Sequence, residues 1–279
     1  MKTNKWITLV LVLAFLAGLS LLLYPSFSDY WNSTRQTRAI ASYAEEVAGM
    51  DPVLKERLWR EAVEYNADLL ERSNPYTLSE DMRARYNDAL RTGHYSALAY
   101  IEIPSLQILL PVYHGTSEQT LLRAIGHLDW TSVPVGGPST HCVISGHRGL
   151  PSAKLFTDLG KMVVGDIFML QVLDETLTYE VDQILIVEPE DVTSLAVVEG
   201  RDYCTLVTCT PYGVNTHRML VRGHRIENLE AEKTVRIISE AMQIEPMVVA
   251  PVVAVPLLLL LLLLYMLDDA VSSKRKRPY

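Results

Sequence analysis

One cysteine in this chain stands where a nucleophile could work. Cys209 is the last residue of the predicted strand 203–209. A Pro-Tyr-Gly turn, which starts at Pro211, follows it. Acyl transfer by cysteine needs a thiolate, a proton-carrying partner and a donor for the developing oxyanion. A cysteine in an apolar strand is commonly a small buried hydrophobe. A strand end before a turn can meet solvent and substrate, so Cys209 is the candidate nucleophile.

His147 and Arg218 have the side-chain chemistry that would complete such a site. His147 follows the expected strand 141–146, and Gly146 and Gly149 close to it leave space for a ligand. Arg218 comes nine residues after Cys209, and a turn between them would bring it back beside the cysteine. Its guanidinium offers a fixed fork of donors and a permanent charge. The alternatives are an ordinary hydrogen-bonded histidine and a surface arginine.

The other two cysteines, Cys142 and Cys204, do not make a disulfide scaffold with Cys209. Three cysteines are an odd number, so at least one thiol is free. Strand alternation places Cys204 on the opposite face from Cys209. No pair of His or Cys residues has a metal-binding spacing, and no dinucleotide or phosphate-loop motif occurs. We therefore expect neither a metal nor a cofactor.

The region that carries these residues has the period of β-strands. Seven short apolar runs, separated by Gly, Pro and Asp, predict a closed or nearly closed antiparallel barrel. Two short helices should interrupt it, one capped by Thr116 and carrying Leu121, Leu122, Ile125 and Leu128, the other beginning at Ser152. The predicted strands are 98–103, 106–113, 141–146, 166–173, 177–187, 203–209 and 217–225.

Residues 35–92 have helical periodicity instead. Apolar residues from Val47 to Leu69 recur at helical spacing, and Asp51-Pro52 after Gly49 predicts a break and a new helix start. The pattern Thr77-x-x-Glu80 predicts a capping box for a further helix that stops at Gly93. Ser73 to Tyr76 between them is a turn-forming stretch.

Both ends of the chain carry an apolar stretch long enough to cross a bilayer. Residues 6–23 and 247–267 contain no charge, and lysines or arginines lie on the terminal side of each. We expect two transmembrane helices in the cell membrane, with both termini cytoplasmic and the region between them extracellular. The alternative for the first stretch is a cleaved signal, since Ser26-Phe27-Ser28 is a passable cleavage site. The net charge of −8 and the lack of a basic stripe argue against nucleic acid as a partner.

The motifs around Cys209 resemble those of the sortase family. Residues 205–209, Thr-Leu-Val-Thr-Cys, are similar to the TLxTC signature of sortases, with His147 upstream in Ser-Gly-His-Arg-Gly and Arg218 downstream. The resemblance covers about 97–225. The segments 208–218, 134–137 and 113–116 are similar to class C, the pilin-polymerising sortases.

The resemblance implies a function. It implies a cysteine transpeptidase that cleaves an LPxTG-like sorting signal between Thr and Gly and joins the acyl group to a lysine of another pilin. Cys209 would be the nucleophile, His147 the general acid and base, and Arg218 the oxyanion stabiliser. Its partners would be pilins, surface proteins with sorting signals and membrane lipid, and we expect a monomer. The alternatives are a hydrolase or cell-wall-anchoring sortase with the same residues, and a non-enzymatic pilin-binding scaffold.

The family also implies a lid over the active site. Many class C sortases close the site with an Asp-Pro-aromatic tip, and Asn74, Pro75 and Tyr76 stand where that tip should be. Asn replaces Asp, so an acid contact to the site would become neutral. The alternative is an ordinary loop.

The expected layout is a mainly β, sortase-like closed barrel of about eight strands with short helices, a helical extension and two terminal spans. In chain order the parts are an anchor or signal at 1–24, a helical extension at 25–96 with a lid loop at 73–77, a catalytic barrel at 97–228, a juxtamembrane helix at 229–246, a transmembrane helix at 247–267 and a basic tail at 268–279.

Overall fold

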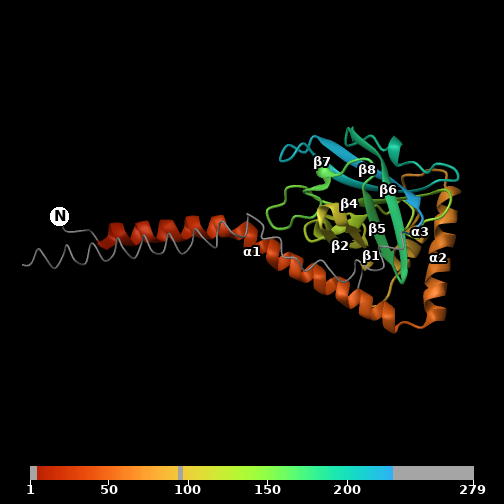
Figure 1. The fold of residues 1–279 in the computed structure, drawn as a ribbon, viewed down its shortest axis with the longest axis horizontal. Coiled ribbons are helices and arrows are strands. Elements are labelled where there is room, and N and C mark those ends of the chain that lie inside the picture. Colours follow the sequence, from red (N-terminus) through yellow and green to blue (C-terminus); the bar gives the residue numbers. More distant parts are fainter. Residues whose placement is uncertain (1–4, 94–96, 229–279) are drawn as a thin grey trace, which may run out of the picture. The chain divides into compact units, whose positions relative to one another are not determined.

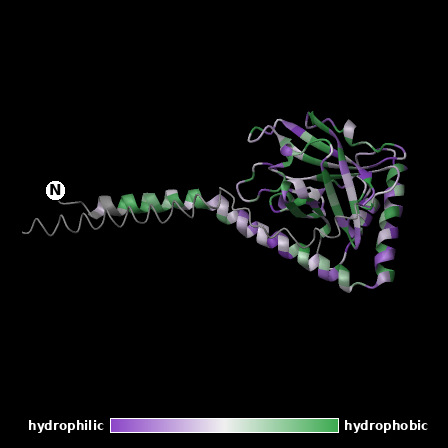
Figure 2. Cartoon of the chain, in the orientation of Figure 1, coloured by the Kyte–Doolittle hydropathy of each residue, from purple (hydrophilic) through white to green (hydrophobic). Residues whose placement is uncertain are grey.

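The computed structural model describes residues 5–93 and 97–228, which belong to two compact units. In the first unit, the described part is the beginning of helix α1 (Lys5–Gly49), which is apolar through its early turns (Figure 2). By length and composition, α1 is the one helix among the described residues that could cross a membrane. The predicted juxtamembrane helix 229–246, span 247–267 and tail lie outside the described residues.

In the second unit, three helical segments form the extension that precedes the barrel. They are the later part of α1, α2 (Pro52–Leu70) and α3 (Glu80–Asp88). The predicted break after Gly49 is confirmed, because the Asp51 side chain accepts a hydrogen bond from the Val53 amide at 2.7 Å and starts α2. The predicted apolar stripe of α2 is also buried: Leu58, Ala62, Tyr65 and Leu69.

Several predicted helix ends were wrong. Ser79, not Thr77, caps α3, and Ser117, not Thr116, caps α4 (Glu118–Leu121). In both places a second hydroxyl lies nearer to the first free amides of the helix, and it accepts their hydrogen bond. Helix α3 ends at Asp88 instead of Gly93, and the helix predicted from Ser152 is a series of turns before the 3-10 segment η2 (Leu159–Lys161).

Eight strands close into a barrel in the order β1-β2-β3-β4-β7-β8-β6-β5 (Figure 1). Each strand is connected to both neighbours, so no sheet edge is left open. Short 3-10 segments, η1 (Pro104–Leu106) and η3 (Thr193–Leu195), lie in the connections. The strands are β1 (Ala97–Ile103), β2 (Ile108–His114), β3 (Ile125–His127), β4 (Thr140–Ser145), β5 (Ile167–Val172), β6 (Glu175–Val187), β7 (Asp202–Thr210) and β8 (His217–Ile226).

The predicted antiparallel barrel was wrong in one respect, because the barrel is mixed. Strand β2 pairs in parallel with β3, and β4 pairs in parallel with β7. Strand β3 is not among the predicted strands, because the helix expected after Thr116 includes Ile125. A strand of three residues is too short to show a period of two, so local pattern cannot separate it from a helix end. The seven other strands lie close to their predicted positions.

The helical extension is fastened to the barrel by buried polar contacts as well as by apolar packing. The Asn66 amide exchanges two hydrogen bonds with the backbone of Val133, at 2.8 and 3.0 Å. The Tyr43 hydroxyl accepts a hydrogen bond from the Leu173 amide at 2.7 Å, and burial raises the pKa of Tyr43 well above its usual value. Figure 1 shows α2 along one side of the barrel. These contacts attach α1 and α2 to the barrel.

We expect Gly126→Ala to destabilise the barrel. A Cβ on Gly126 in β3 would collide with the backbone carbonyl of Gly115, and a backbone group cannot retreat as a flexible side chain can. Overpacking of this kind costs about 1–3 kcal/mol, so thermal unfolding of the full chain in detergent should shift to lower temperature. Gly49→Ala is the control, because nothing lies within 4 Å of a Cβ there. Equal unfolding temperatures for the two variants would contradict the close approach of β3 to Gly115.

Candidate active site

Cys209 and Arg218 lie directly opposite each other on neighbouring strands. In the antiparallel pair β7–β8 their Cα atoms are register partners. The chain returns through a turn in which the Val214 and Asn215 amides donate to the Pro211 carbonyl, at 3.1 and 3.0 Å. The turn predicted between the two strands is confirmed, and it sets the cysteine beside the arginine.

His147 reaches the same end of the barrel from the other side of β7. Each residue of β4 pairs in parallel with the β7 residue 62 positions later, as Cys142 does with Cys204. The ladder continues past β4, since the Gly146 amide donates to the Val207 carbonyl at 3.0 Å. Continued two residues past Ser145, the same register would bring His147 level with Cys209. The candidate residues therefore belong to β7, β8 and the segment that directly follows β4.

Cys209 differs from the other cysteines in its exposure. Cys142 and Cys204 are buried, whereas Cys209 is half-buried, and all three are free thiols. Cys204 and Leu206 belong to the main core cluster of the barrel, while Val207 packs in the smaller cluster around Val143. The predicted alternation is thus confirmed. It leaves Cys209 as the described cysteine that solvent can reach.

Arg218 is held by the backbone of its own hairpin. Its Nη1 donates to the carbonyl oxygens of Asn215 and His217, each at 3.2 Å. Within 5–93 and 97–228, no carboxylate forms a salt bridge with Arg218, whereas His217 pairs with Glu188 at 3.2 Å. The guanidinium is therefore positioned without being neutralised, and it keeps donors for a substrate oxygen.

The loop of His147 is tied to β7 by two residues that stand in the quoted motifs but were not among the predicted site residues. The Thr208 hydroxyl donates to the Gly146 carbonyl at 2.8 Å, and Arg148 Nη1 donates to the Thr210 hydroxyl at 3.1 Å. A Cβ on Gly146 would collide with Ile125 and Phe156. Thr208 and Arg148 lie next to the candidate residues within the two quoted motifs, and that position is the signal that could have found them.

The predicted lid tip rests on Trp130. The rings of Tyr76 and Trp130 meet edge to face with centroids 5.3 Å apart, and the Asn74 side chain accepts from the Tyr76 amide at 2.9 Å. Trp130 packs against the cluster of Val143, Leu195 and Leu220, and so does Val207, which precedes Cys209 by two residues. Pro75, Tyr76 and Trp130 also line a cavity of about 240 Å³. An aromatic contact thus holds the tip, and among the described residues no salt bridge involves it.

We expect Tyr76→Ala to make Cys209 more reactive, if the tip screens the thiol. Loss of an aromatic pair worth about 0.5–1.5 kcal/mol should raise the open fraction, and with it the alkylation rate of Cys209 by iodoacetamide, by about 2- to 10-fold. Val164→Ala, at another exposed apolar position, is the matched control. An unchanged rate in Tyr76→Ala would make residues 73–77 an ordinary loop.

Within the described ranges, no group of three or more His, Cys, Asp or Glu side chains is arranged to hold a metal ion. The chemistry available is that of a thiol, an imidazole and a guanidinium.

Comparisons with known proteins show which family this chain belongs to. The Sortase domain family model matches residues 101–226. Sortase C1 from Streptococcus agalactiae is 49% identical and superposes with a TM-score of 0.67, covering 69% of this chain and 100% of that one. The chain therefore belongs to the sortase family.

Several of the solved structures that it resembles are sortases of class C, as the sequence motifs predicted. Sortase C from Streptococcus pneumoniae, whose structure was described in terms of catalysis and pilin substrate specificity, is 44% identical with a TM-score of 0.62, covering 68% of this chain and 97% of that one. Sortase C from Clostridium perfringens, solved with the C-terminal cell wall sorting motif, is 40% identical with a TM-score of 0.61, covering 69% and 100%. The chain spans 66% of Sortase D from Bacillus subtilis, at 28% identity over 138 residues, or 48% of this chain.

Proposed function

We propose that this sortase is a transpeptidase that cleaves an LPxTG-like sorting signal between Thr and Gly and joins the acyl group to a lysine of another pilin. The observation that carries the proposal is the register of β7 and β8, which sets Cys209 opposite Arg218. The parallel register of β4 with β7, continued past Ser145, would bring His147 to the same end of the barrel. The class C character of the solved relatives supports pilins as the substrates.

In the first half of the reaction, Cys209 takes the acyl group. Its thiolate attacks the threonine carbonyl, a C–S bond forms, and the carbonyl oxygen becomes an oxyanion. Arg218 donates hydrogen bonds to that oxyanion, which is more negative than the ground-state carbonyl, so it favours the transition state over the substrate. The intermediate collapses as the Thr–Gly C–N bond breaks, and protonated His147 gives its proton to the departing amine.

In the second half, a lysine amine replaces the lost glycine. The amine attacks the thioester, neutral His147 accepts its proton, and the thiolate of Cys209 leaves as an isopeptide bond forms. The thioester retains the acyl energy of the original peptide bond, so no external energy source is required. Water competes with the amine at this step, and hydrolysis would release a free threonine carboxylate.

The same proposal gives the chain its place at the membrane. The apolar helix α1 is a candidate anchor, and residues 97–228 would act on the extracellular face, with 25–96 as the extension that carries the lid loop. Pilins outside the cell would meet the site there, and the enzyme would work as a monomer.

Co-expression with a pilin that bears a sorting signal tests the proposal. The full chain should give SDS-resistant ladders on the cell surface, because each step adds a covalent bond between subunits. Free threonine carboxylate without ladders would indicate a hydrolase instead, and a single adduct to wall material would indicate an anchoring sortase. Ladders that persist with Cys209→Ala would favour a scaffold without catalysis.

A further inference from the structure

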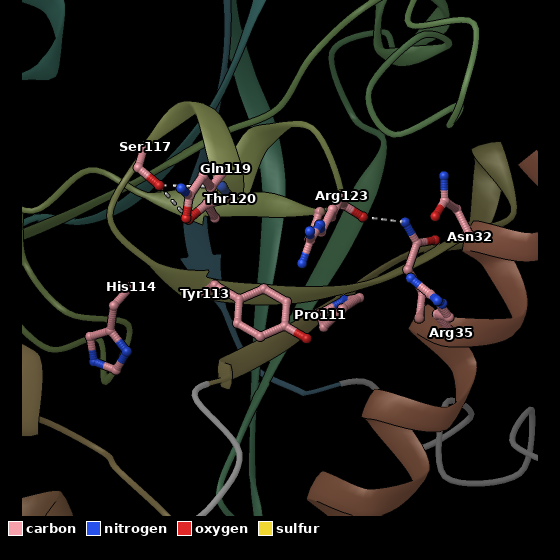
Figure 3. Close-up of a pocket in the computed structure, with 11 residues that line it drawn as sticks. Asn32, Arg35, Pro111, Tyr113, His114, Ser117, Gln119, Thr120 and Arg123 are labelled. Atoms are coloured by element: carbon pink, nitrogen blue, oxygen red, sulfur yellow. Dashed lines mark hydrogen bonds between the residues drawn. The ribbon is translucent and has the colours of Figure 1, made fainter. Parts of the chain in front are cut away.

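A second concave site lies between the helical extension and the β2–β3 region. It has a volume of about 400 Å³, within the range of small-molecule pockets, and none of Cys209, His147 and Arg218 lines it. Figure 3 shows side chains from α1 on one side and from residues 111–124 on the other. Those that matter for its chemistry are Asn32, Arg35, Gln36, Tyr113, His114 and Arg123.

The lining of this pocket is positively charged. Arg35 and Arg123 contribute two guanidinium groups, and the lining contains no Asp or Glu. Neither arginine takes part in a salt bridge with any residue that the structure describes. The whole chain carries a net charge of −8, so a pocket with two arginines and no acidic residue has the opposite charge to the chain as a whole. A bound anion would supply the missing negative charge.

The walls of the pocket are joined to each other and to the barrel. Gln36 Nε2 on α1 donates to the Arg123 carbonyl at 2.9 Å, and Asn32 Nδ2 donates to the Ser152 carbonyl at 2.7 Å. On the other side, His114 Nε2 lies 3.0 Å from the Ala89 carbonyl. A site held in this way is preformed, so a ligand would not have to order its walls on binding.

Several hydrogen-bond donors remain for a ligand. Figure 3 shows the Arg123 side chain directed toward the ring of Tyr113. Burial raises the pKa of Tyr113, so its hydroxyl stays protonated and can donate at neutral pH. Arg35 lies over the Trp31 ring, 5.2 Å from its centroid, and such stacking leaves the in-plane N–H groups of a guanidinium available. Two guanidinium forks and a hydroxyl suit an anion that accepts in several directions, and phosphate does so better than a single carboxylate.

We propose that the pocket between α1 and residues 111–124 binds a phosphate ester. Two sources share this chemistry: the headgroup of a membrane phospholipid and a soluble phosphate ester. Asn32 follows the apolar stretch 6–23 by nine residues, which can reach about 30 Å even when fully extended. If that stretch is a membrane anchor, the pocket cannot move far from the headgroups of the bilayer.

Binding measurements on the full chain test this proposal. In a neutral detergent, titration with glycerol phosphate by calorimetry should show saturable binding. Arg35→Gln combined with Arg123→Gln should weaken it about 10-fold or more, as expected for the loss of charge-assisted hydrogen bonds. Arg57→Gln combined with Arg60→Gln removes the same charge from α2, outside the pocket, and should change the affinity less than about 2-fold. No saturable binding, or equal loss in both double variants, would overturn the proposal.

Two further arms separate the source and the chemistry. Native mass spectrometry of the full chain from bilayer discs of phosphatidylcholine with phosphatidylglycerol should show retained phosphatidylglycerol that the pocket variant loses. Retention by neither protein, with glycerol phosphate still binding, would assign the site to a soluble ester. An acidic peptide that binds where glycerol phosphate does not would overturn the proposal in favour of a protein partner. These readouts do not depend on transpeptidation, so they can fail while the catalytic proposal stands.

Discussion

Cys209→Ala is expected to abolish transpeptidation. Without the thiol no thioester can form, and removal of a covalent nucleophile costs about 10⁴-fold or more in turnover. Cleavage of a fluorogenic sorting-signal peptide by the full chain in detergent would give the rate. Mass spectrometry of the same reaction should show an acyl adduct on the wild-type chain and none on the variant.

Cys204→Ala is the matched control for this experiment. Cys204 lies on the same strand, β7, but it is buried in the barrel core, paired in register with Cys142. Its truncation should lower stability through a small cavity while the turnover of folded protein stays within a few-fold of wild type. Equal loss in the two variants, with both folded, would mean that Cys209 is not the nucleophile.

Arg218→Ala is expected to lower turnover by about 10²-fold or more while the fold remains intact. Arg218 makes its described hydrogen bonds to its own hairpin, so its truncation removes an oxyanion donor and little packing. The loss should appear in kcat, because the charge it stabilises develops in the transition state. Peptide cleavage measured over a range of substrate concentrations separates kcat from KM.

Two further variants serve as comparisons for Arg218→Ala. Arg218→Lys keeps a positive charge but loses the planar fork, so its turnover should lie between those of wild type and Arg218→Ala. Arg201→Ala removes an exposed arginine just before β7, at the opposite end of the strand from Cys209, and should leave kcat unchanged. Turnover by Arg218→Ala within a few-fold of wild type would rule out the oxyanion role.

Features that depend on neighbouring residues were predictable from the sequence. The return of the chain from Cys209 to Arg218 needs only a turn near Pro211 and two strands of the right length, and the register confirms it. The start of α2 depends on Asp51 and Pro52 alone, and it too is confirmed. Burial of Cys204 opposite a half-buried Cys209 follows from the alternation of a single strand.

Features that depend on distant residues were not predictable in the same way. The parallel pairing of β4 with β7 joins segments 62 positions apart, and nothing local in either strand specifies direction. Strand β3 exists because β2 and β4 offer it partners, since three residues have little preference of their own. The family motifs predict that His147 lies near Cys209, but the parallel β4–β7 register that would bring it there could be found only from the coordinates.

The residues that cap α3 and α4 were predicted wrongly for a different reason. Thr77 and Ser79, like Thr116 and Ser117, offer hydroxyls within two residues of each other, and either could accept from the first amides of a helix. The choice depends on where the chain leaves the preceding turn, which tertiary packing decides. The pocket between α1 and residues 111–124 could not be predicted from the sequence either, because Arg35 and Arg123 are 88 positions apart.

The most direct test of the account is a crystal structure of the enzyme with a sorting-signal peptide analogue linked covalently to the Cys209 sulfur. We expect the Arg218 guanidinium to lie within hydrogen-bond distance, about 3 Å, of the threonine carbonyl oxygen, with the His147 imidazole beside the sulfur. A complex in which Arg218 and His147 both point away from the linked peptide would contradict it.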